Sequence, residues 1–149
     1  MAALTAVAVT AEVALVAATA RTVLQLVAPT NHALKVLGWS VSFDGISSVA
    51  EPVVCTLIRQ TTAGTMTALT PVKLDSGRDE TIQATAQHTA TAEPTDSDVL
   101  ARRNVHPQAG YEVIYPPGQE PIVGTAGRIA VKCTAPAGVN VVAEIRFEE

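Results

Sequence analysis

Alternation of apolar with polar or small residues is the dominant pattern along this chain, and it predicts β-strands. Successive side chains of a strand point to opposite sides of a sheet, so apolar residues two positions apart share one face. Between residues 37 and 43 the alternating apolar residues are Leu37, Trp39, Val41 and Phe43. Asp44-Gly45 then ends the run with residues that favour a turn. The pattern predicts a strand with Trp39 and Phe43 on its buried face.

The clearest alternation lies at the C-terminal end, in residues 129–134 and 139–148. The alternating apolar residues there are Ile129, Val131, Cys133, Val139, Val141, Ala143, Ile145 and Phe147. The four residues between the two runs, Ala-Pro-Ala-Gly, are typical of a turn. We therefore expect a hairpin with one face toward water. The residues expected to be buried together are Trp39, Phe43, Val131, Ile145 and Phe147.

Further strands are expected at Val53–Gln60, where Pro52 suits a strand start, and at residues 5–17, 22–28, 81–88 and 110–115. Only the Ala-rich start offers a helix as a competing reading, since Ala is the best helix former. The polar stretch 90–108 is expected to be a long loop. The sequence thus predicts an all-β fold, an antiparallel jelly-roll-like β-sandwich of about eight strands.

Residues 1–20 differ from the rest in being apolar with a single charge, Glu12. A signal peptide needs an early positive charge, and the first cation is Arg21. Several threonines interrupt the stretch, which disfavours a membrane span. We divide the chain into an apolar N-terminal arm or first strand (1–20) and a jelly-roll-like β domain (21–149). Because an uncovered strand edge templates other strands, the arm needs a partner. It can pair within its own sandwich or add a strand to a neighbouring chain, and we favour the neighbour.

Composition and charge bear on the partners. Charged residues are 16% of the chain against a usual share of about 25%, which suggests that part of the surface is covered by another molecule. The formal net charge is −4, and the one adjacent basic pair is Arg102-Arg103. Aromatic residues are only 3%. These values argue against nucleic acid as a partner, since it requires clustered basic residues and stacking platforms.

The sequence predicts no catalytic residue, no cofactor and no metal site. His32, His88 and His106 lie in different segments without a second ligand at helical spacing. The acidic residues of the 90–108 stretch are expected to be solvated, because they lack the glycine and distal glutamate of a helical calcium loop. These residues are Glu93, Asp96 and Asp98.

Two cysteines, Cys55 and Cys133, both stand in alternating apolar runs. Buried free thiols are the expected state, and a single disulfide stays open. No base stands beside Cys55 in the sequence, and a thiol on a strand face is usually inert. We therefore expect that the protein is not an enzyme.

Several phrases of the chain from about Ala20 to Glu149 resemble the head decoration, or auxiliary capsid, proteins of tailed bacteriophages. They are Thr22-Val-Leu-Gln-Leu26, Leu34-Lys-Val-Leu-Gly-Trp-Ser-Val-Ser-Phe-Asp-Gly45, Glu51-Pro-Val, Leu57-Ile-Arg-Gln60, His106-Pro-Gln and Phe147-Glu-Glu149. The resemblance implies a jelly-roll-like sandwich on the outer capsid surface of the virion, made in the bacterial host cytoplasm. It implies a homotrimer that binds the major capsid protein and fastens neighbouring capsomers. It carries over no catalytic residue and does not include the segment before Thr19.

Two other readings stay open. One is a carbohydrate- or receptor-binding β-sandwich of a phage tail or a bacterial surface protein, for which the candidate sugar platforms are Trp39, Tyr111 and Tyr115. Trp39 alternates with core residues and is therefore expected in the core instead. The other is a secreted bacterial surface module, which depends on a signal peptide.

Overall fold

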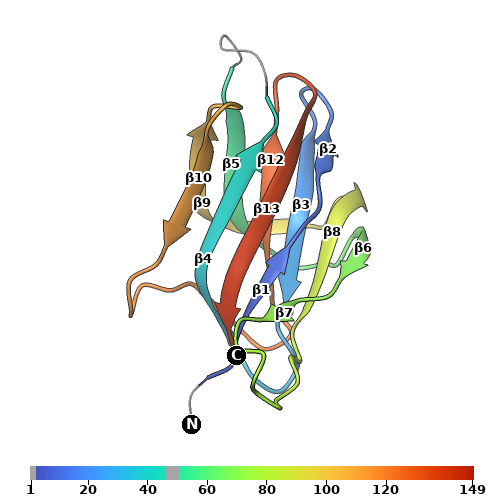
Figure 1. The fold of residues 1–149 in the computed structure, drawn as a ribbon. Helices are drawn as coiled ribbons and strands as arrows, with labels where there is room; N and C mark the ends of the chain where they lie inside the picture. Colours follow the sequence, from blue (N-terminus) through green and yellow to red (C-terminus); the bar gives the residue numbers. More distant parts are fainter. Residues whose placement is uncertain (1–2, 46–50) are drawn as a thin grey trace.

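The computed structural model describes residues 3–45 and 51–149, and the regular structure in these residues consists of β-strands (Figure 1). Two antiparallel sheets face each other. The seven-stranded sheet has the order β10 (Gly110–Ile114), β4 (Leu34–Phe43), β13 (Val139–Glu148), β1 (Thr5–Val9), β7 (Val72–Lys73), with β11 (Ile122–Val123) beside β4 and β2 (Val13–Leu15) beside β13. The six-stranded sheet has the order β6 (Thr65–Leu69), β8 (Thr85–Ala92), β3 (Ala20–Val27), β12 (Arg128–Thr134), β5 (Val53–Gln60), β9 (Asp96–Val105). The fold is therefore an all-β sandwich, as expected.

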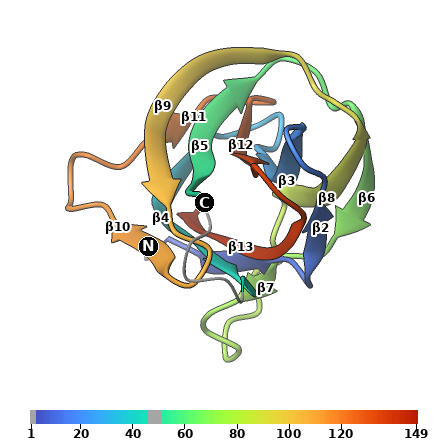
Figure 2. The same ribbon diagram turned by 90° about the horizontal axis from the view of Figure 1, so that it is seen from above.

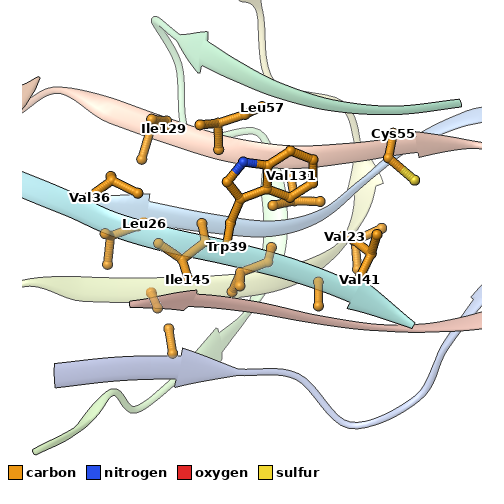
Figure 3. Packing of buried hydrophobic residues seen from close by; sticks show 14 of the residues in the cluster. Val23, Leu26, Val36, Trp39, Val41, Cys55, Leu57, Ile129, Val131 and Ile145 are labelled. Atoms are coloured by element: carbon orange, nitrogen blue, oxygen red, sulfur yellow. The ribbon is translucent and has the colours of Figure 1, made fainter. Parts of the chain in front are cut away.

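The core fills the space between the two sheets, which curve around it in the view from above (Figure 2). Trp39 of β4 lies among aliphatic side chains of both sheets, including Leu57 and Val131 (Figure 3). Its ring nitrogen donates a hydrogen bond to the Tyr115 hydroxyl at 3.2 Å, so the polar atom of this buried ring is satisfied. The alternation from Trp39 to Phe43 thus corresponds to the inward face of β4. Leu37 was expected on the same face and is not, because a register shift opposite Arg146 and Phe147 buries Val36 instead.

Four of the five residues expected at the centre are fully buried, namely Trp39, Val131, Ile145 and Phe147. The expectation for Phe43 was wrong in degree, because Phe43 is only partly buried. It is the last residue of β4 and lies opposite Val141 at one end of the sheet. Alternation along the sequence indicates on which face of a strand a side chain lies. It does not indicate how far the residue is from the end of the sandwich.

The two C-terminal strands are present, but the expected hairpin between them is wrong. β12 pairs with β3 and β5 in one sheet, whereas β13 pairs with β1, β2 and β4 in the other. The short Ala135–Gly138 connection therefore passes from one sheet to the other. Both arrangements need the same turn residues, so the local sequence does not distinguish them.

The stretch 90–108, expected to be a loop, contains the ten-residue strand β9. β9 forms one edge of the six-stranded sheet and pairs with β5 through two register shifts. Most of its side chains are exposed. An edge strand with water on both faces does not need alternating residues, which is why the pattern concealed it.

The N-terminal segment lies inside its own sandwich, so the favoured pairing with a neighbouring chain was wrong. β1 pairs with β13 on one side and with β7 on the other. Ala6 and Ala8 are fully buried on its inner face. Both edges of β1 are thus occupied by strands of the same chain, which leaves none to offer to a neighbour.

Candidate interaction surface

Exposed apolar side chains gather on the outer face of the seven-stranded sheet. In the described residues, eight large hydrophobic side chains are exposed: Val9, Val16, Val72, Leu74, Val99, Leu100, Ile114 and Ile122. Five of them lie on this outer face, namely Val9, Val72, Leu74, Ile114 and Ile122. Val16 lies in the turn after β2, and the other two lie on the edge strand β9. Exposed apolar side chains gathered on one face of a sheet mark candidate protein interaction sites.

Strand register places three of these residues on one flank of the face. In β1 the buried alanines alternate with Val7 and Val9, which must therefore point outward. Val72 lies directly opposite Val7. Leu74 continues the same ladder, because its N–H donates to the carbonyl of Thr5 at 3.0 Å. Residues 7, 9, 72 and 74 thus form one apolar strip along β1 and β7.

The other flank carries two isoleucines. Ile114 lies opposite Gly38, and Ile122 lies opposite Lys35, both on β4. Both isoleucines point outward. Gly38 and Lys35 also lie opposite Arg146 and Glu148 of β13, whose side chains point outward, and opposite residues of paired strands share one side of the sheet. Ile114 is 64% exposed, the most of any large hydrophobic side chain in the described residues.

Gly38 allows β10 to reach its place on this flank. A Cβ atom at Gly38 would lie 2.4 Å from the carbonyl oxygen of Val113, closer than real Cβ contacts come. Any other residue at this position would push β10, and Ile114 with it, away from β4. The glycine between Leu37 and Trp39 thus has a structural role that the alternation alone did not suggest.

Paired charges occupy the centre of the outer face. The Arg146 guanidinium donates to Glu144 at 2.5 Å and lies 3.4 Å from Glu112, and Lys35 lies 3.6 Å from Glu148. Such exposed pairs contribute little to stability. Because each charge already has a partner, covering the face costs less desolvation than covering isolated charges. The outer face therefore combines apolar flanks with a centre of paired charges, three carboxylates and two cations, which suits contact with another protein.

The sequence pattern did not reveal this surface. Val72 and Leu74 follow Pro71, and Ile122 follows Pro121, in segments too short to show a period. The weak alternation in residues 5–9 was the one available signal. Which apolar residues share an outer face depends on strand pairing between segments far apart in the chain.

All three acidic residues that were expected to be solvated are exposed, but two of them are also bonded to the six-stranded sheet. The Glu93 carboxylate accepts hydrogen bonds from the Thr22 N–H and hydroxyl, and it lies 3.4 Å from the Lys132 ammonium. Asp96 accepts from Lys132 at 2.6 Å and from the Gln60 amide at 2.9 Å. Asp98 is exposed, as expected.

These contacts form a polar cluster beside β3, β5 and β12. Burial by itself lowers the pKa of Lys132, but the hydrogen bond to Asp96 and the nearby Glu93 raise it above its ordinary value. The Gln60 amide also donates to the Thr22 hydroxyl at 3.0 Å and accepts from Gln25 at 2.8 Å. The cluster fastens the β8–β9 connection to the sheet, which is a structural role.

The three histidines lie apart, and each has its own neighbour. The His32 ring lies 3.7 Å from the Glu149 carboxylate, His88 contacts the Thr89 hydroxyl, and His106 accepts the Gln108 N–H. In residues 3–45 and 51–149, no three His, Cys, Asp or Glu side chains converge as a metal ion would require. The same residues include no helix long and apolar enough to cross a membrane.

The cysteines, by contrast, are neighbours. Cys55 and Cys133 face each other across β5 and β12, with their sulfur atoms 3.6 Å apart. Both are fully buried free thiols. The hydrogen bond to Cys55, together with burial, raises the pKa of Cys133 well above its ordinary value. Cys133 is therefore not activated as a nucleophile in the closed fold, and burial keeps both thiols away from solvent.

The candidate sugar platforms belong to one aromatic cluster rather than to an exposed shelf. Trp39 is buried, and the Tyr111 ring lies 5.2 Å from it in a tilted arrangement. Arg103 lies over the Tyr111 ring at 5.4 Å and donates to its hydroxyl at 3.0 Å. Tyr115 accepts from Trp39. These contacts leave the outer face of the seven-stranded sheet as the candidate site. No family model, no curated protein and no solved structure matches this chain.

Proposed function

We propose that this chain is a virion structural protein, a capsid decoration protein of a tailed bacteriophage. It is made in the host cytoplasm, binds the major capsid protein on the outer surface of the head and fastens neighbouring capsomers as a homotrimer. The proposal includes no enzymatic activity and no cofactor. It starts from the resemblance of the segments between Thr22 and Glu149, and two features of the fold support it.

The observation that carries the proposal is the gathering of exposed apolar side chains on the outer face of the seven-stranded sheet. Val72 is 63% exposed and Ile114 is 64% exposed, on opposite flanks of that face. A monomer in water gains nothing from exposing such residues on one face, whereas burial against another protein removes their apolar area from water. We assign this face to the contact with the capsid surface.

We also infer that the sandwich is a jelly roll. Eight strands taken in chain order support this: β1, β3, β4, β5, β9, β10, β12 and β13. The first pairs with the last, the second with the seventh, the third with the sixth and the fourth with the fifth. This nested pairing results when a long antiparallel hairpin folds over into two sheets. Jelly rolls are common in viral capsid and lectin domains, which favours a binding role.

The direct test is whether the chain is present in purified virions of the phage that carries its gene, and in how many copies. Decoration requires many copies on the head, whereas a tail module is present in a handful. Light scattering on the purified chain or on the decorated head should give three chains per unit. A chain missing from virions, or present at tail stoichiometry, contradicts the proposal.

A matched pair of variants tests the assigned face. Ile114→Glu would bury an unpaired carboxylate in the contact and should weaken binding to undecorated heads at least tenfold, which corresponds to about 1.4 kcal/mol. Val16→Glu introduces the same charge at a residue that is similarly exposed, at 57%, but lies in the turn after β2. It should leave head binding unchanged. If the two variants changed the affinity for undecorated heads equally, a surface other than this face would bind the head.

A further inference from the structure

Cys55 and Cys133 stand in the geometry from which a disulfide forms. They are directly opposite residues of the antiparallel strands β5 and β12. Opposite residues of such strands have Cα atoms about 4.5–5.5 Å apart, within the roughly 4.4–6.8 Å that disulfides span. Their sulfur atoms are already 3.6 Å apart, and both side chains are enclosed by the core. A small rotation of the side chains is enough to bring the sulfurs to bonding distance.

We propose that Cys55 and Cys133 form an intramolecular disulfide when the chain folds in the presence of a disulfide oxidant such as oxidised glutathione, and that this bond locks β5 to β12. The two strands are neighbours inside the six-stranded sheet, with β3 and β9 on their other sides. The lock therefore acts between two inner strands of the sheet rather than at its edge, close to one end of both strands.

The exchange balances with oxidised glutathione as the two-electron oxidant. The thiolate of one cysteine attacks a glutathione sulfur, which forms a mixed disulfide and releases one glutathione thiolate. The second cysteine thiolate then attacks the protein sulfur of that mixed disulfide and releases the second glutathione. The protons lost by the two cysteines are taken up by the two glutathione thiolates. The protein sulfurs are oxidised and glutathione is reduced.

Burial determines when this reaction proceeds. Both cysteines have no exposed surface, so a peptide-sized oxidant does not reach them in the closed fold. The raised pKa of Cys133 also keeps little of it as the reactive thiolate. Oxidation therefore takes place during folding or when the sheet opens transiently. The folded protein with free thiols persists for some time in an oxidising solution.

The bond connects residues 78 positions apart in the chain. Closing so long a loop restricts the unfolded ensemble, which favours the folded state. For a chain of this size we expect the melting temperature to rise by roughly 5–10 °C. If the proposed function holds, the chain folds in a reducing cytoplasm and later leaves the cell, so the lock would form there only when the sheet opens transiently. The chemistry itself does not depend on that function.

The test is to refold the full chain in a series of oxidised and reduced glutathione mixtures. A parallel series holds the chain unfolded in concentrated urea. After acid quenching, free thiols are counted with a chromogenic disulfide reagent in denaturant, and products are separated on a non-reducing gel. In the folded series the protein should lose both free thiols at a glutathione ratio that leaves the protein in urea reduced. The oxidised product should run as a single chain on the non-reducing gel.

Several outcomes would overturn the proposal. They are retention of both thiols in the folded series where the urea series is oxidised, a bond between two chains, and a melting temperature that falls on oxidation. Cys55→Ala and Cys133→Ala serve as controls, since neither can form the bond and oxidised glutathione should not raise their melting temperatures. The wild-type thiol count decides the matter even if a control variant fails to fold.

Discussion

The Glu93 carboxylate accepts the backbone N–H of Thr22 at 2.9 and 3.1 Å and the Thr22 hydroxyl at 2.7 Å. Pairing between β3 and β8 runs from Val27 only as far as Leu24 opposite His88. Thr22 lies two residues beyond Leu24. There the Glu93 side chain, from the β8–β9 connection, accepts the backbone N–H that a neighbouring strand would otherwise accept. Because Thr22 is fully buried, its polar groups depend on this carboxylate.

Replacing Glu93 should therefore destabilise the fold. Glu93→Ala leaves the Thr22 N–H and hydroxyl buried without this acceptor, which costs about 1–3 kcal/mol in the free energy of unfolding. Urea denaturation of variant and wild type measures the difference. Glu112→Ala is the control, because Glu112 is largely exposed and its ion pair with Arg146 is worth little. Equal losses for the two variants would show that the Thr22 contact is unimportant.

The two phenylalanines of the chain should differ in how much they contribute to stability. Phe147 is fully buried, so Phe147→Ala should cost about 3–5 kcal/mol. Phe43 is only partly buried at the end of β4, so Phe43→Ala should cost about 1–2 kcal/mol. Thermal or urea unfolding of both variants checks the order. A larger loss for Phe43 would contradict the placement of this residue at the rim.

Removal of the N-terminal segment should unfold the domain or destabilise it strongly. Deleting residues 2–18 takes away β1 and β2, which together pair with most of one edge of β13. It also exposes the core beneath Ala6 and Ala8. Circular dichroism and thermal melting of the truncated chain measure the effect. A truncated chain that melts at the wild-type temperature would restore the view that the segment is a separable arm.

Thr89 offers a stabilising substitution. It has a φ of +55° within β8, a left-handed conformation that is strained for a β-branched residue. Thr89→Gly should relieve roughly 1–2 kcal/mol of this strain. It also adds the roughly 0.5–1 kcal/mol entropy cost of a strand glycine and loses the contact with His88, so the net stabilisation should be less than about 1 kcal/mol. Thr85→Gly, in the same strand without a positive φ, should destabilise by about 0.5–1 kcal/mol. Urea denaturation should therefore give opposite signs for the two glycines.

The Glu80 carboxyl should titrate unusually low. The hydrogen bond from Arg78 is the main reason that its pKa is lowered to about 2, whereas an unfolded chain has a Glu pKa of about 4.3. The pair thus adds stability above about pH 4.3, and this stability is lost as the pH falls toward 2. Carboxyl NMR titration should show the Glu80 midpoint rising toward the ordinary value in Arg78→Gln. It should stay low in the control Arg102→Gln.

Much of the fold is determined by local alternation. The inward faces of β5, β12 and β13, and that of β4 from Trp39 to Phe43, follow from period two, because successive residues of a strand point to opposite sides of the sheet. The bounds of β5 and β13 agree closely with the apolar runs. Turn residues such as Asp44-Gly45 and Ala135–Gly138 also mark where these strands end. These signals act between residues close in the chain, so they are legible without a tertiary structure.

Only the tertiary structure decided which strands are neighbours. β12 pairs with β3 and β5 rather than with β13, and β1 fills the space between β13 and β7 of its own chain. The same pairing brings Cys55 to Cys133 and sets Val72 beside Val7. Such choices depend on the burial and hydrogen bonding of whole strands far apart in sequence. Local periodicity determines which side of a strand is apolar. The packing of the whole chain determines which strands and side chains that apolar side contacts.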